Sequence, residues 1–216
     1  MRTRTGFDHE LQVLQDQILL MGSMVEKQLD SAIAALKALN HDAARRVIEG
    51  DDEIDRLRFT IEDHAIHLIA TQQPMATDLR TLVAALSIIV DLERMGDHAE
   101  GIAKIVLMHG EQPLLKPLVD IPRMAELAGG MCHRALDAFV ARDELRAQAV
   151  CDQDDEVDQL YNQVYRELLT YMLNDPRTID RATWLLWVAH NLERIADRAT
   201  NIAERVTYLA TGRLPA

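Results

Sequence analysis

One stretch of the chain occurs twice, and it constrains the fold more than any other feature of the sequence. The first copy covers residues 91–103 (DLERMGDHAEGIA) and the second covers residues 191–203 (NLERIADRATNIA). Leu, Glu, Arg, Asp, Ala, Ile and Ala recur at the same places in both copies. Because chance rarely repeats so many residue types in register, the sequence indicates an internal duplication.

Each copy has the periodicity of a helix with an acidic edge. Small and apolar residues form one stripe in the first copy, at Leu92, Gly96, Ala99, Ala103 and Val106. At about 100° per residue, the acidic residues fall together in an arc of about 60° beside this stripe. They are Glu93, Asp97 and Glu100 in the first copy. In the second, Glu193, Asp197 and Thr200, with Glu204 just beyond it, take the same arc.

Two interpretations of the acidic arc remain open at this point. Like charges four residues apart repel one another on a helix, so their repetition beside a core stripe indicates a bound cation. The alternative is a solvated acidic flank that Arg94 and Arg194 neutralise.

Composition favours a helical protein and excludes several classes of partner. Aromatic residues are only 4% of the 216 residues, so Ala, Leu, Ile and Met must build the core, as in helical bundles. The net charge of −12 makes nucleic acid and anionic lipid poor partners. The longest apolar run, residues 82–90, is too short to span a bilayer, and no signal peptide is visible. Cys132 and Cys151 are expected to be reduced thiols, which indicates the cytoplasm.

Six helices are expected from the apolar periodicity. The first is capped by Asp8 and runs to Leu39, and the second and third cover about residues 43–71 and 75–108. The fourth covers about residues 121–139, the fifth ends near Leu173, and the sixth ends near Gly212. No strand pattern occurs. The proline-rich segment 110–122 separates two sets of three helices, so we predict an all-α protein of two similar three-helix bundles, residues 1–112 and 113–216.

A second duplicated segment adds further carboxylates. Residues 51–57 (DDEIDRL) match residues 154–160 (DDEVDQL), and both place acidic residues four apart beside an apolar stripe. We therefore expect four carboxylates to converge in each half, and oxygen ligands of this kind suit hard cations. The predicted metal ligands are Asp51, Asp55, Glu93 and Asp97 in the first half, and Asp154, Asp158, Glu193 and Asp197 in the second.

The doubled Leu-Glu-Arg-x-x-Asp, together with Asp78-Leu79-Arg80, resembles the PhoU family of bacterial phosphate-signalling regulators over nearly the whole chain. The resemblance implies two three-helix bundles whose acidic motifs hold Fe, Zn, Mn or Mg. It also implies a cytoplasmic homodimer that represses the phosphate regulon by linking the ATPase subunit of the phosphate ABC transporter to a sensor histidine kinase.

The chain departs from the family pattern at two positions of the first copy. Gly101 stands where the family commonly has Asn, which the second copy keeps as Asn201. Lys104 stands where the second copy has Glu204, and it can reach back to Glu100 as an ion pair. Four residues are additional candidate ligands: Glu100, Glu62, Asn201 and Glu204.

Two other functions compete with that of a regulator. A carboxylate-bridged di-metal enzyme on a helical bundle needs Glu-x-x-His on two helices, and no glutamate here has a histidine three residues later. There is also no nucleophile elbow and no glycine-rich phosphate loop, so we predict that the protein is not an enzyme. The remaining alternative is a plain helical interaction module with solvated acid pairs.

Overall fold

The computed structural model describes residues 4–212. Within this range the chain forms six α-helices and one short 3-10 turn, and no strand. The elements are α1 (Arg4–Ala38), α2 (His41–Gln72), α3 (Thr77–His109), α4 (Asp120–Ala141), α5 (Glu144–Asn174), η1 (Pro176–Thr178) and α6 (Ile179–Thr211). The predicted all-α class and the order of six helices are confirmed.

Local sequence signals fix most of the helix ends. The side chain of Asn40 caps α2 by accepting from the Ala43 backbone N–H at 3.0 Å. Asp143 caps α5 in the same way, at 3.1 Å from the Arg146 backbone nitrogen. Gly212, with φ of 73°, ends α6 in the left-handed conformation that glycine adopts without strain. One expectation is wrong: Asp8 does not cap α1, because the helix already runs from Arg4 and Asp8 lies exposed within it.

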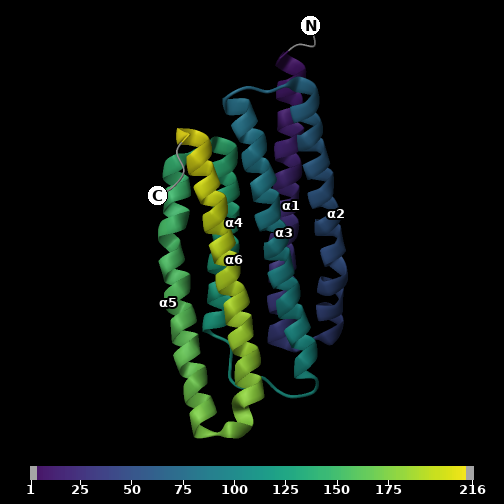
Figure 1. Ribbon diagram of the computed structural model, residues 1–216. Coiled ribbons are helices and arrows are strands. Elements are labelled where there is room, and N and C mark those ends of the chain that lie inside the picture. Colours follow the sequence, from purple (N-terminus) through teal and green to yellow (C-terminus); the bar gives the residue numbers. More distant parts are fainter. Residues whose placement is uncertain (1–3, 213–216) are drawn as a thin grey trace.

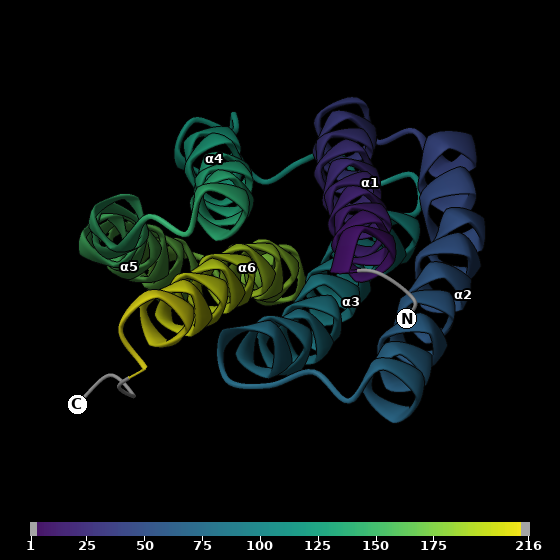
Figure 2. The same cartoon turned by 90° about the horizontal axis from the view of Figure 1, so that it is seen from above.

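The six long helices lie side by side, with α3 and α6 next to each other in the middle (Figure 1). Seen from above, α1, α2 and α3 group on one side and α4, α5 and α6 on the other (Figure 2). The two groups touch through α3 against α6 and through α1 against α4. The segment between α3 and α4 contains the predicted boundary between residues 112 and 113, and this division stays a prediction.

The predicted apolar stripes form the centre of one continuous core. Leu92, Ala99, Ala103 and Val106 of α3 are fully buried, and so are their counterparts Leu192, Ala199, Ala203 and Val206 of α6. The α3 stripe faces the other helices of its own half, since Gly96 lies against Gln28 of α1 and against Asp51 and Ile54 of α2, and its burial contributes to the packing of that half. Because the stripes occupy the inner faces, the acidic arcs beside them lie at the edges of the helix contacts.

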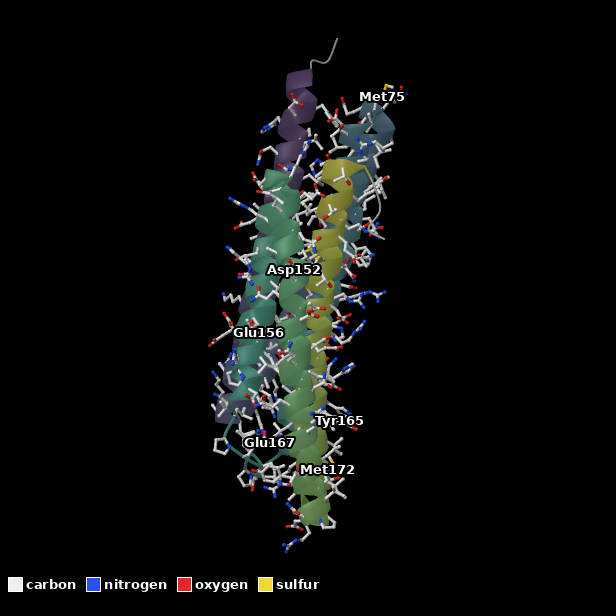
Figure 3. The ribbon with its side chains drawn as sticks, turned by 90° about the vertical axis from the view of Figure 1, so that its left-hand side faces the viewer. Met75, Asp152, Glu156, Tyr165, Glu167 and Met172 are labelled. Carbon is white, nitrogen blue, oxygen red and sulfur yellow. The ribbon has the colours of Figure 1, made fainter. Side chains whose placement is uncertain are left out.

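The outer helix α5 is joined to its neighbours by ion pairs. Arg123 of α4 donates to Glu156 at 2.6 Å, and Lys116, from the segment before α4, donates to Glu167. Figure 3 shows both glutamates on α5, with Asp152 on the same helix. Cys132 is buried and Cys151 is half-buried, and both thiols are free. No helix between residues 4 and 212 has the length and apolar character needed to cross a membrane.

Candidate functional site

Three carboxylates of the first half converge where α2 meets α3. Oxygen atoms of Asp51 on α2 and of Asp97 and Glu100 on α3 all lie within 4.8 Å of one another. Oxygens on opposite sides of a cation bound at about 2.0–2.6 Å are about 4–5 Å apart, so this spacing suits a hard cation. Asp51 is buried, and it accepts a hydrogen bond of 2.8 Å from Gln28 of α1.

A glycine of the duplicated stretch makes room for the Asp51 carboxylate. A Cβ atom at Gly96 would lie 3.1 Å from Asp51 Oδ1 and 3.2 Å from Gln28 Oε1. Both side chains therefore approach the backbone of α3 more closely than any other residue at this position would allow. Gln28 Oε1 is itself buried without a hydrogen-bond partner in the described part of the chain.

Burial and neighbouring carboxylates raise the pKa values of Asp51, Glu93 and Asp97. Burial raises the pKa of Asp51, and the charges of Glu100, Asp97 and Asp55 raise it further. Burial and the neighbouring Asp97 likewise raise the pKa of Glu93, on which Asp55 also acts. For Asp97, burial again comes first, followed by Asp55 and Glu100. The charges of Asp55 and Asp97 thus act on both Asp51 and Glu93. Of the four predicted ligands, only Asp51 and Asp97 belong to the group of close oxygens, and its third member is Glu100.

A second acidic cluster joins α5 and α6. Burial raises the pKa of Asp154 to about 6, with further contributions from Asp158, Asp197 and Glu193. Burial also raises the pKa values of Asp158 and Glu193, and Asp197 is the next cause for both. Asp154 Oδ1 and Glu193 Oε2 are buried without a hydrogen bond among residues 4–212. Buried polar atoms rarely lack a partner, so Asp154 Oδ1 in particular is suited to bind an ion.

Basic side chains offset part of this negative charge. Arg194 donates to Asp197, and His190 Nδ1 lies 3.4 Å from Glu193 Oε2. In the first half the predicted ion pair between Lys104 and Glu100 is present. The alternative of a neutralised acidic flank therefore describes part of each cluster, but it leaves Asp154 Oδ1 without a partner among residues 4–212.

Of the four additional candidate ligands, one belongs to the group of close carboxylate oxygens in the first half, and the other three lie elsewhere. Glu100 belongs to the group of Asp51 and Asp97. Glu62 lies 3.4 Å from Arg58, and Glu204 is exposed on α6. The amide of Asn201 donates at 3.3 Å to Asp91 of α3, across the contact between the two central helices. Whether any of the predicted ligands binds metal stays a prediction.

The contact between α3 and α6 contains polar pairs that the sequence analysis missed. Asp91 Oδ1 accepts from Asn201 at 3.3 Å and from Arg198 at 3.4 Å. The position equivalent to Asp91 in the second copy is Asn191, whose Oδ1 lies 2.9 Å from His98 Nδ1. His98 is equivalent to Arg198. The contact of Arg198 on α6 with Asp91 on α3 is therefore repeated by His98 on α3 with Asn191 on α6. Such reciprocity is what a local two-fold axis produces.

The same axis accounts for the first departure from the family pattern. Gly101 is equivalent to Asn201, and a Cβ atom there would lie 3.2 Å from Asn191 Oδ1. Asn201 of α6 faces Asp91 of α3. At the equivalent place Gly101 of α3 faces Asn191 of α6. The sequence contained a hint of this exchange. The two copies differ at both contacting positions, with Asp91 against Asn191 and Gly101 against Asn201.

A family model described as the PhoU domain matches the chain twice, over residues 18–106 and 121–206. A phosphate-specific transport system accessory protein PhoU homolog of Caulobacter vibrioides is 45% identical over 211 residues, which cover 97% of this chain and 92% of that protein. A relative of the same description from Aquifex aeolicus is 44% identical over 205 residues, covering 95% and 93%.

Solved structures agree with these sequence matches. The crystal structure of PhoU from Pseudomonas aeruginosa matches with a TM-score of 0.91 at 36% identity, covering 96% of this chain and all of that one. The structure of the phosphate transport system regulatory protein PhoU from Streptococcus pneumoniae matches with a TM-score of 0.90 at 33% identity, covering 97% and 99%.

Proposed function

The chain belongs to the PhoU family, and we propose that it is an accessory and regulatory protein of a bacterial phosphate transport system. The observation that carries this proposal is the match over nearly the full length of relatives described as accessory to phosphate-specific transport. The helical fold agrees with a role in binding other proteins, because six long helices offer extended surfaces.

The finer role follows from the family resemblance. The protein acts as a negative regulator of the phosphate regulon, and it couples the ATPase subunit of the phosphate ABC transporter to a sensor histidine kinase. It works as a homodimer in the cytoplasm, where the free thiols of Cys132 and Cys151 stay reduced. It acts through binding and not through catalysis.

The two acidic clusters bind divalent or trivalent metal ions, with Fe, Zn, Mn or Mg as the candidates. The donor set supports this proposal, because oxygens of Asp51, Asp97 and Glu100 approach one another within 4.8 Å in the first half. In the second half, Asp154 Oδ1 is buried without a hydrogen-bond partner among residues 4–212. Asp51 and Asp55 would act with Glu93 and Asp97, and Asp154 and Asp158 with Glu193 and Asp197. A bound cation supplies positive charge that neutralises these groups and links α2 to α3 and α5 to α6.

A gene deletion tests the regulatory role. In phosphate-replete medium, loss of the protein should derepress the phosphate-starvation genes, so alkaline phosphatase activity should rise. Expression of the parent chain from a plasmid should restore repression, which excludes effects on neighbouring genes. Normal repression in the deletion strain would contradict the proposed role and would leave the fold and the family unaffected.

A further inference from the structure

A cleft of about 380 Å³ opens between α3 and α6, and charged side chains line it. The lining residues are Glu93, Arg94, Asp97, His98, Arg194 and Arg198. A cleft for an apolar ligand would have hydrophobic and aromatic walls, and this one has none among its lining residues. Its ligand must therefore be charged or strongly polar.

The basic residues of the cleft occupy equivalent positions of the two duplicated stretches. Arg94 corresponds to Arg194, and His98 corresponds to Arg198, one helical turn further along. The local two-fold axis between α3 and α6 thus brings three guanidinium groups and an imidazole to one opening. The three guanidinium charges repel one another, and Glu93 and Asp97 of the same lining offset part of this cost. A bound anion between the arginines would offset the rest.

The arginines keep donors that the protein does not use. Arg94 is exposed and forms no ion pair with any residue in the range 4–212. Arg198 reaches Asp91 only through Nη1, at 3.4 Å, and its buried Nε has no partner among the described residues. Arg194 donates to Asp197 through Nη1. Because each guanidinium carries five N–H donors, most of them remain for a ligand.

We propose that this cleft binds a phosphate-type oxyanion. The planar fork of arginine matches two oxygens of such an ion at once. When no metal ion occupies them, Glu93 and Asp97 of the cleft lining add selectivity, because a carboxylate accepts a hydrogen bond from an oxyanion that keeps a proton. Inorganic phosphate keeps a proton at neutral pH, whereas sulfate does not. The site goes beyond the proposed regulatory role, which does not require this protein to bind phosphate itself.

The test is isothermal titration calorimetry of the full chain, with inorganic phosphate, sulfate and ATP as separate ligands. All titrations contain EDTA, since a metal ion on the proposed ligands Glu93 and Asp97 would attract phosphate by itself. We expect saturable binding of phosphate with Kd of about 1 mM or tighter. Sulfate should bind at least about fivefold more weakly. Tighter binding of phosphate than of ATP identifies the free ion as the ligand, and the reverse order identifies a phosphoryl group on a larger molecule.

A matched pair of double variants assigns the binding to the cleft. Arg94→Gln with Arg194→Gln removes the two equivalent arginines, and should weaken phosphate binding at least about tenfold. Arg56→Gln with Arg205→Gln makes the same change in net charge at two exposed positions outside the cleft, and should leave Kd within about twofold. Thermal melts of both variants verify that they fold.

Three results would overturn the proposal. The first is an absence of phosphate binding by the parent chain in EDTA, including the case where binding appears only after Mn²⁺ is added. The second is equal weakening by both double variants, which would indicate a general effect of net charge. The third is equal affinity for phosphate and sulfate, which would contradict the role of Glu93 and Asp97.

Discussion

Asp51 of α2 lies directly against Gly96 of α3, so closely that a Cβ atom on the glycine would sit 3.1 Å from the carboxylate oxygen Oδ1. The equivalent position of the second half is Ala196, which is fully buried. The two halves therefore differ in how an acidic side chain of the outer helix meets the central helix. This difference leads to a prediction about stability.

Gly96→Ala should not stabilise the protein. Alanine in a helix interior is normally favoured over glycine by about 1 kcal/mol, but here the methyl group would displace Asp51 and Gln28. Gly50→Ala is the control, because Gly50 lies inside α2 and a Cβ atom there would meet no neighbouring side chain or helix within 4 Å. We expect this control to raise the Tm by about 2–4 °C and Gly96→Ala to leave it unchanged or lower it. Equal gains for both variants would contradict the close contact.

Asp154 makes the stability of the metal-free protein depend on pH. Its pKa is about 6 in the folded protein and 3.8 ordinarily, so the folded state holds more protons than the unfolded state between these values. Stability should therefore fall as the pH rises from about 4 to about 6, and stay low above that window. We expect Asp154→Asn to flatten this part of the profile and to raise the Tm at pH 7.5, both measured in EDTA by thermal melts.

Asp152→Asn is the control for this prediction. Asp152 is exposed on the same helix, so its substitution removes a carboxylate without relieving the buried cluster. The pH profile of this variant should keep the slope of the parent. Equal slopes for the parent and for Asp154→Asn would show that Asp154 does not carry the effect.

Much of the fold could be predicted because the local signals and the packing agree. Asn40 and Asp143 are good helix caps, and both do cap helices. The stripe that begins at Leu92 is buried throughout, as its spacing predicted. The family was also readable from the doubled motif, and the predicted membership is confirmed. The prediction that Asp8 caps α1 was wrong because aspartate also occurs at exposed positions inside helices. Local sequence alone does not distinguish a capping position from such an interior position.

The site was predictable along each helix and not between helices. Helical spacing puts Glu93 and Asp97 on one arc, and the matching segment supplies Asp51. The role of Gln28 could not be inferred, because it depends on how α1 packs against α2 and α3. The pairing of Asp91 with Asn201 likewise depends on the register of two helices about a hundred residues apart.

Metal binding by the clusters should respond to single substitutions. We expect Glu93→Gln and Glu193→Gln each to lower the metal content of the purified protein, because each removes one charged ligand from one cluster. Native mass spectrometry after purification without chelator and with added Mn²⁺, Fe²⁺ or Zn²⁺ measures the bound ions. Glu49→Gln, at an exposed position of α2, should keep the parent's metal content. Metal near zero in every protein, the parent included, would return the clusters to solvated acidic flanks.

The pair formed by Asp91 and Arg198 should contribute to the contact between α3 and α6. Both side chains are largely buried, with exposed fractions of 13% and 16%, and their charged atoms lie 3.4 Å apart. Asp91→Asn would leave the Arg198 guanidinium without its counter-charge, so we expect a loss of about 1–3 kcal/mol in the free energy of unfolding. Urea denaturation measures this change.

A double-mutant cycle separates the pair from its surroundings. Arg198→Gln should also destabilise the protein, but the double variant should lose less than the sum of the two single losses, by at least about 0.5 kcal/mol. Asp91→Asn combined with Arg56→Gln is the control, because Arg56 is exposed on α2 and the two losses should simply add. If the losses in the Asp91 and Arg198 cycle are additive, the interaction between these two side chains contributes nothing to the free energy of unfolding. A positive coupling would show that the pair formed by Asp91 and Arg198 stabilises the contact between the two central helices.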